Sequence, residues 1–280
     1  CRLKHAISDS LKQNNLHTMA VALSLQCALL LGVAYSAQGF LRQTGGSSGF
    51  VKAIEFKHTL RVCNAYPYQG SLDVYRTKDK LTDSPMAYKS CKDFQPQLKT
   101  GDKLEFKVGD ATAGTFAVSD LPSNDAILLL IVHRHDQVST AVAFESHVFA
   151  NLAAAQVAVF DTYKGSEKSM PRITDHNADK NQSRSEELRF SSIVAVNPGF
   201  YDVELDGTDG AVKAKSQLVA LSHQSYVVIR TGVESRTGSP FAQDLMIYPN
   251  SDPIELRSGA LGARITAALL VVISAFATYA

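Results

Sequence analysis

The stretch that decides the fold is VCNAYPYQGS, residues 62–71, because a related stretch, VAVFDTYKGS, follows at residues 157–166. Valine, tyrosine, glycine and serine recur at the same places, 95 positions further along the chain. Two more pairs of segments keep this order at a similar spacing: 104–108 with 201–205, and 127–132 with 226–231. Self-similarity at a fixed period is typical of a duplicated structural unit. The sequence therefore predicts two consecutive copies of one fold.

Short apolar stretches separated by turn residues fill both copies, and they follow strand patterns rather than a helical period. The predicted strands cover 59–64, 72–75, 103–108, 115–118, 126–133, 139–149, 155–160, 193–196, 201–205, 211–214, 225–231 and 242–248. We therefore expect an all-β chain with two tandem immunoglobulin-like β-sandwich domains, at residues 59–152 and 153–252.

The opening of the first copy resembles a known family. LRVCNAYP at residues 60–67, followed by LDVY at 72–75, is similar to the opening of the extracytoplasmic β-sandwich family labelled domain of unknown function 4397. PGFYDV at 198–203 resembles the family's later turn and strand. In the second copy Asp161-Thr162-Tyr163 replaces the family's Asn-Ala-x-Pro. The resemblance, over about residues 59–252, implies a fold and an extracytoplasmic location and supplies no catalytic residues.

Residues 19–37, MAVALSLQCALLLGVAYSA, carry no charge and end in small side chains. This pattern is typical of a secretory signal peptide. We expect a leader with a signal helix over residues 1–39, starting at Cys1 or at Met19, and a linker over 40–58. A buried core helix or an uncleaved anchor is the alternative.

The last 16 residues, ITAALLVVISAFATYA at 265–280, are also uncharged. Their layout is typical of a glycosylphosphatidylinositol attachment signal. Ser258, followed by two small residues, is the predicted lipid-attachment site, with Asn250 as the alternative. A hydrophobic helix that anchors the chain in the membrane is the competing interpretation. In either case residues 253–280 tether the protein to a membrane.

Cys63 and Cys91 are the two cysteines between these ends. In an oxidising compartment they predict one disulfide that closes a loop of 28 residues, whereas two buried free thiols are the alternative. Asn181, in the sequence Asn-Gln-Ser, is a predicted N-glycosylation site of a secreted protein.

The charge balance excludes one class of partner. The whole chain has 28 basic and 27 acidic residues, and 24 and 26 of these remain once residues 1–39 and 259–280 are left out. With charges so nearly balanced, the chain has no net positive electrostatic field that would attract nucleic acid.

His133 and His135 are the candidate metal ligands. On a strand their side chains point to the same face, as two imidazole ligands of zinc or copper would. If the flanking strands form a hairpin around residues 136–138, however, His147 lies at the far end of the ladder and the third ligand is missing. The favoured interpretation is therefore a set of polar residues where a buried strand reaches solvent, and no metal or other cofactor is expected.

Two further motifs favour structural interpretations. GGSSG at residues 45–49 matches a hydrolase nucleophile motif around Ser47, but no helix follows it, which favours a linker. Asp202, Asp206 and Asp209 have part of the spacing of a calcium loop but lack its final glutamate, which favours a hairpin turn.

Four tyrosines near the predicted disulfide, at positions 66, 68, 75 and 88, are a candidate stacking surface for a sugar or a protein. Core packing is the competing interpretation.

These patterns together predict a non-enzymatic, secreted or membrane-tethered surface protein of the secretory pathway that acts in recognition, adhesion or scaffolding. Its partners would be a membrane and an unidentified protein or glycan. The alternatives are a glycan-binding module, an accessory subunit of polysaccharide modification, and a metal-binding surface protein that uses His133 and His135.

Overall fold

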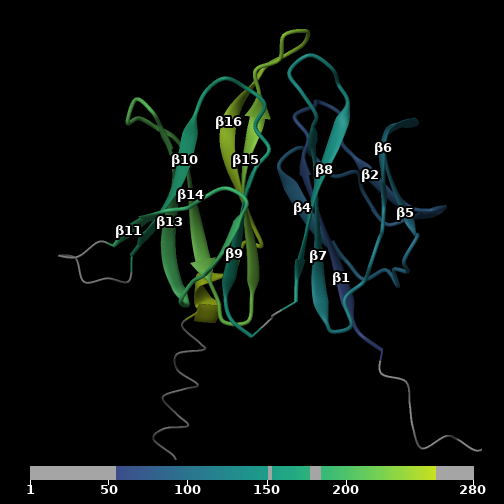
Figure 1. Ribbon diagram of the computed structural model, residues 1–280, viewed down its shortest axis with the longest axis horizontal. Helices are drawn as coiled ribbons and strands as arrows, with labels where there is room; N and C mark the ends of the chain where they lie inside the picture. Colours follow the sequence, from purple (N-terminus) through teal and green to yellow (C-terminus); the bar gives the residue numbers. More distant parts are fainter. Residues whose placement is uncertain (1–54, 151–152, 177–183, 257–280) are drawn as a thin grey trace, which may run out of the picture. The chain divides into compact units, whose positions relative to one another are not determined.

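Figure 1 shows the computed structural model, which describes residues 55–150, 153–176 and 184–256. These residues form sixteen β-strands in four sheets and one helical turn at 253–256, which confirms the predicted all-β fold. The predicted signal helix and the hydrophobic segment at 265–280 lie outside the described residues. Within the described ranges, no helix has the length and apolar character that a membrane span requires.

The first eight strands form two four-stranded sheets, with strand orders β4-β1-β7-β8 and β3-β2-β5-β6. Their bounds are β1 His58–Ala65, β2 Asp73–Arg76, β3 Asp79–Lys80, β4 Ser90–Phe94, β5 Lys103–Val108, β6 Ala111–Ala117, β7 Ala126–Arg134 and β8 Val142–Phe149. All neighbours are antiparallel except β1 and β7, which run parallel.

The next eight strands repeat this topology with every strand number raised by eight, giving the sheets β12-β9-β15-β16 and β11-β10-β13-β14. Their bounds are β9 Gln156–Asp161, β10 Ser169–Asp175, β11 Ser185–Glu187, β12 Ser192–Ala195, β13 Gly199–Gly207, β14 Val212–Ala220, β15 Ser225–Val233 and β16 Phe241–Tyr248. β9 and β15 form the matching parallel pair. The chain thus contains the same eight-stranded unit twice, called here the first and second sandwich.

The register of the repeat differs by two residues from the sequence alignment. Asn64 Oδ1 accepts a hydrogen bond from the amide of Tyr66, and Asp161 Oδ1 accepts the same bond from Tyr163, both at 3.1 Å. These two turns end β1 and β9, so the equivalent positions are 64 and 161, which are 97 apart rather than 95. The difference is even, so it leaves the alternation of inner and outer side chains unchanged.

Each sandwich has its own apolar core between its two sheets. In the first, Leu60 and Val62 of β1 pack with Val74 of β2 and with Leu104 and Phe106 of β5. In the second, the equivalent strands contribute Val157 and Val159 of β9 and Val203 and Leu205 of β13. The cores form because one face of each sheet is apolar and must be removed from water.

A third apolar cluster joins the two sandwiches, which belong to one compact unit. The opposite faces of β1 and β7 contribute Cys63, Leu129 and Ile131, and those of β9 and β15 contribute Ala158 and Ile229. β7 and β15 are therefore buried on both faces, which explains why their sequences, AILLLIVHR and SYVVIRTGV, do not alternate. We call this cluster the central interface.

Four strands were not predicted, namely β3, β4, β10 and β11. β4 is SCKDF and β11 is SEE. Because their side chains are mostly polar, the sequence pattern does not identify them as edge strands. β10 contains Pro171, and it pairs with β11 only over residues 172–174. Ser185–Glu187 forms β11 at the end of a charged segment in which the sequence pattern predicts no strand.

Candidate functional site

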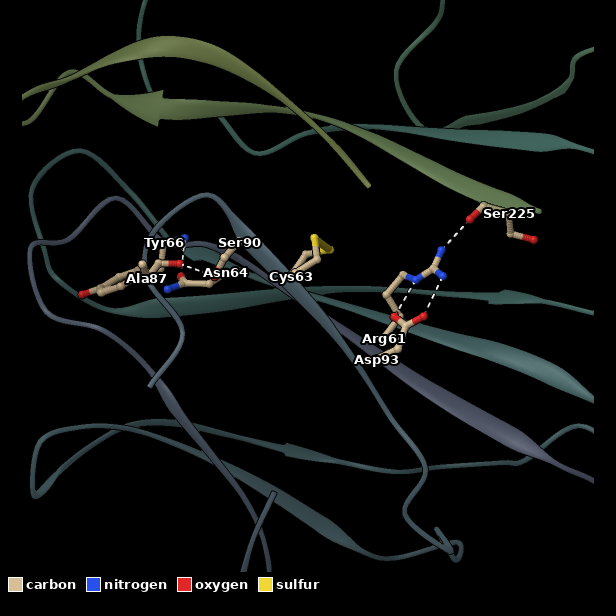
Figure 2. Close-up of a disulfide and its surroundings, with 9 residues drawn as sticks. Arg61, Cys63, Asn64, Tyr66, Ala87, Ser90, Asp93 and Ser225 are labelled. Atoms are coloured by element: carbon tan, nitrogen blue, oxygen red, sulfur yellow. Dashed lines mark hydrogen bonds and ion pairs between the residues drawn. A yellow bond between two sulfur atoms is a disulfide. The ribbon is translucent and has the colours of Figure 1, made fainter. Parts of the chain in front are cut away.

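The predicted disulfide is confirmed: Cys63 of β1 bonds to Cys91 of β4 (Figure 2). The two residues are direct cross-strand partners with Cα atoms 4.1 Å apart, so the bond ties β4 to the strand beside it. Cys63 is buried in the central interface. The predicted sites at Asn181 and Ser258, and Ser47 of the GGSSG motif, lie outside the described residues. Asn250 is exposed just after β16.

His133 lies near the end of β7 with 3% of its surface exposed. Its Nδ1 is 2.9 Å from the carbonyl oxygen of Arg134, and its Nε2 is 4.0 Å from Oε1 of Glu145 on β8. Nε2 has no hydrogen-bond partner among the described residues. Burial lowers the pKa of His133 to about 4. The side chain is therefore a neutral imidazole inside the protein at ordinary pH.

The structure does not bring the other predicted ligand to this position. His135 is exposed in the hairpin turn after β7, and its Nδ1 is 3.0 Å from Oδ2 of Asp136. That contact, together with hydrogen bonds from Ser139 and Val138, holds the pKa of Asp136 well below its usual range. Among the residues that the structure describes, no three His, Cys, Asp or Glu side chains gather as a metal site would require.

The hairpin itself forms as expected, since β8 pairs antiparallel with β7. His147 lies opposite Leu129, near the far end of the ladder, which closes at the pair Ile127 and Phe149. Its ring contacts that of Phe149 edge-on at 4.8 Å.

The three aspartates of the calcium-like motif each contact a different cation. Asp202 lies 2.7 Å from Lys215, Asp206 lies 2.5 Å from Arg172, and Asp209 lies 2.8 Å from Lys213. The first two pairs form part of a charged ladder on the outer face of β10, β13 and β14, where oppositely charged side chains lie across from one another. The arrangement agrees with the hairpin-turn interpretation.

The four tyrosines do not form a common surface. Tyr66 is buried and tilted against Tyr68, with ring centroids 5.6 Å apart. The Tyr88 ring instead contacts Phe241 of the second sandwich, and burial raises its pKa to about 12. Core packing therefore describes Tyr66, whereas Tyr88 is half-buried against the second sandwich and Tyr68 is exposed.

Tyr75 has a different environment, on the outer face of the sheet β3-β2-β5-β6. Lys107 Nζ lies 4.8 Å from its ring centroid and Lys80 Nζ lies 6.0 Å away. Acidic groups flank these amines: Lys80 contacts Asp73 at 3.0 Å, and Lys107 contacts Glu105 at 3.4 Å. This face combines an aromatic ring with hydrogen-bond donors and acceptors, the kind of surface that can bind a polar ring-shaped ligand. We call it the Tyr75 face.

The second sandwich contains a buried polar network that the sequence did not reveal. Arg230 of β15, 4% exposed, donates to Asp161, to the carbonyl of Glu167 and to Gln243. Its guanidinium lies over the ring of Tyr163 at 4.3 Å. The only signal in the sequence was an arginine inside an apolar run. A guanidinium with its donors paired can be buried in this way.

The neighbouring loop is closed by Glu234. Its carboxylate accepts hydrogen bonds from the Tyr163 hydroxyl at 2.7 Å and from the amide and hydroxyl of Ser166 at 2.8 and 2.9 Å. These bonds lower the pKa of Glu234 to about 2, while burial and the carboxylate raise that of Tyr163. The network fixes the segment between β9 and β10 against the end of β15.

An apolar cavity of about 80 Å³ opens in the first sandwich between β6 and β8. Its wall includes Leu128, Phe116 and Val118, with Ser146 and Val148 of β8 at one side.

No protein-family model matches the chain, and no curated protein matches it. Among solved structures, it is similar to a carbohydrate-binding module of family CBM26 from Eubacterium rectale Amy13K, crystallised with maltoheptaose. The identity is 6%, the match covers 71% of this chain and 99% of the module, and the TM-score is 0.23. A similarity at that TM-score carries no argument about the fold or the ligand of this chain.

Proposed function

We propose that the protein is a secreted, membrane-tethered recognition module of a cell surface or extracellular compartment, without catalytic activity of its own. In this proposal two immunoglobulin-like β-sandwiches present their outer faces and loops to a partner. The resemblance to the family labelled domain of unknown function 4397 points in the same direction.

The central interface is the observation that carries this proposal. Arg61 of the first sandwich, Tyr88 and Lys89 each bond to the second sandwich, to Ser225, Thr231 and Asp244 respectively. Together with the shared apolar cluster, these contacts would hold the two sandwiches as one unit and keep their outer faces at a fixed separation. A scaffold of that kind suits recognition, because its surfaces need not be ordered when a ligand binds.

The extracytoplasmic location is supported by the Cys63–Cys91 disulfide, since such bonds persist mainly in oxidising compartments. The tether is tested on cells that express the full chain. Release from membranes by a phosphatidylinositol-specific phospholipase supports a lipid anchor at Ser258 or Asn250. Retention that resists both the enzyme and alkaline carbonate indicates a transmembrane helix, and recovery of the intact chain in the cytosol contradicts the proposal.

Glycan binding is the second candidate function, and the Tyr75 face is the observation that favours it. A tyrosine ring flanked by two lysines and two carboxylates can stack on a sugar and bond to its hydroxyl groups. The test is a glycan array probed with the full chain, its Tyr75→Ala variant and, as a matched control, Tyr68→Ala. Glycan binding at this face requires that Tyr75→Ala lose the signal and Tyr68→Ala keep it. Equal signals from all three proteins would exclude the Tyr75 face.

A further inference from the structure

The edge of β8 is the feature from which we infer an interaction surface. β8, Val142–Phe149, pairs with β7 over its whole length without a register shift, and it is the last strand of its sheet. A last strand presents unpaired backbone groups along one side. β8 is therefore eight residues of regular strand with one side open.

The hydrogen-bond pattern shows which residues of β8 direct their backbone groups to the open side. The amide of His135 donates to the carbonyl of Ala141 at 2.9 Å, so these two residues form a hydrogen-bonded pair. Hydrogen-bonded and non-hydrogen-bonded pairs alternate along an antiparallel ladder. The backbone N–H and C=O groups of Ala143, Glu145 and His147 consequently point toward β7. Those of Phe144, Ser146 and Val148 point to the open side.

The other edge strands of the described sheets carry features that discourage pairing with another chain. Short length, lysine side chains and register shifts all serve this purpose. β3, β11 and β12 have two, three and four residues, β4 and β14 carry lysines, and β6 and β16 each show a register shift against their neighbour. β8 has eight residues, no register shift against β7, and neither lysine nor proline, and its one acidic side chain is Glu145.

Apolar surface accompanies this open edge. Val148 is 41% exposed beside the apolar cavity, and Phe144 is only partly buried. The corresponding edge strand of the second sandwich, β16, instead buries its core-facing Leu245 and Ile247. The exposed valine and the open cavity thus belong to the first sandwich and lie along the same edge that lacks protection.

We propose that two copies of the chain associate through β8, edge to edge and antiparallel, with Ser146 of one copy opposite Ser146 of the other. The sequence VAFESHVF is complementary to itself in this register. Glu145 lies opposite His147 of the second copy, and Phe144 lies opposite its Val148. The pairing joins the two sheets into one continuous sheet with twofold symmetry.

The alternation of hydrogen-bonded and non-hydrogen-bonded pairs along β8 agrees with this register. Ser146 opposite Ser146, and Phe144 opposite Val148, are the pairs whose backbone groups point to the open side, so they form the new hydrogen bonds. Glu145 and His147 then form a non-hydrogen-bonded pair, in which side chains come closest. Opposite charges or donor and acceptor groups across such a pair stabilise it, and like charges destabilise it.

The first test is sedimentation velocity of the full chain in a density-matched mild detergent. The proposal predicts a reversible dimer, and it predicts that Val148→Lys raises the dissociation constant by about tenfold or more, since an edge lysine opposes strand pairing. Val212→Lys is the matched control, because Val212 is 51% exposed on β14, an edge strand of another sheet. A monomer at all concentrations, or a dimer that Val148→Lys leaves unchanged, overturns the proposal.

The second test addresses the register and does not depend on lysine at position 148. His147→Glu places Glu145 opposite a glutamate and should weaken the dimer, and adding Glu145→His should restore it. Ser146→Cys should be joined to a second copy by a short bismaleimide, whereas Val212→Cys should not. Failure of both the restoration and the cross-link overturns this register, and circular dichroism of each variant verifies that it is folded.

Discussion

The guanidinium of Arg61 donates a 2.5 Å hydrogen bond to the backbone carbonyl of Ser225, which lies 164 residues further along the chain (Figure 2). Arg61 is 2% exposed, forms two 2.8 Å bonds to the carboxylate of Asp93, and lies 4.9 Å from the ring centroid of Tyr248. A charge this deeply buried is tolerated because its donors are paired. One side chain of β1 thus links the first sandwich to the start of β15.

Replacing Arg61 with methionine should lower the free energy of unfolding by about 3 kcal/mol, because it leaves Asp93 without its partner and removes the bond to Ser225. Urea unfolding of the full chain measures this. The matched control is Arg172→Met, whose side chain is 43% exposed beside Asp206 and should cost less than about 1 kcal/mol. Equal losses in the two variants would show that Arg61 has no special role.

Removing the disulfide with Cys63→Ala and Cys91→Ala together should cost about 3–4 kcal/mol, since the bond closes a loop of 28 residues. The loss should appear as a lower urea midpoint and should equal the effect of reducing the wild-type chain. Alkylation of either cysteine in unreduced, denatured protein, detected by mass spectrometry, would contradict the bond itself.

Stability should depend on pH through His133, whose pKa is about 4 in the folded protein and near 6.5 when unfolded. Between these values the unfolded chain binds a proton that the folded chain does not, so stability is complete above pH 6.5 and falls as the pH drops toward 4. The loss is at most about 3 kcal/mol. The decrease attributable to Glu234, with a pKa near 2, begins only below pH 4.5.

The check is the pH dependence of thermal unfolding for the wild-type chain and for His133→Leu. The difference in stability between the two proteins should change by the predicted amount between pH 6.5 and pH 4. A difference that stays constant over this interval would mean that His133 is not buried as a neutral group.

Gly232→Ala should destabilise the protein by about 2–4 kcal/mol, because Gly232 has φ of 126° at the register shift between β15 and β16. An added Cβ there would lie 2.6 Å from the carbonyl oxygen of Ala242, which is backbone and cannot rotate away. Gly210→Ala is the comparison, since Gly210 also has positive φ but open space around it. Thermal unfolding should show the larger loss at Gly232, and a larger loss at Gly210 would contradict the steric argument.

Apolar periodicity was sufficient to predict most of the strands. Runs such as residues 126–133 and 225–231 identify strands buried on both faces, and Cys63 and Cys91 identify the disulfide. Apolar periodicity does not identify β4 and β11, because their own side chains are mostly polar. They are strands because they hydrogen-bond to the strand beside them. The two-residue error in the repeat has a similar origin. The alignment matched identical residues in the loops, whereas the equivalent positions in the structure are the turns at Asn64 and Asp161.

Sequence patterns do not predict the contacts that join the two sandwiches. A lone arginine such as Arg61 or Arg230 is ordinarily exposed, and its burial depends on partners that are distant in the chain. The candidate metal, calcium and tyrosine sites, for which the sequence already favoured structural interpretations, do not come together among the described residues, because spacing along a strand does not specify which neighbour lies across from it. The self-complementary sequence of β8 has a consequence only because β8 is an edge strand, which the sequence does not predict.

Differential scanning calorimetry of the full chain tests most directly whether the two sandwiches act as one unit. The central interface predicts a single cooperative transition, with a calorimetric enthalpy equal to the van't Hoff enthalpy, and Arg61→Met should lower its midpoint as a whole. Two separate transitions in the wild-type chain, one for each sandwich, would contradict the account.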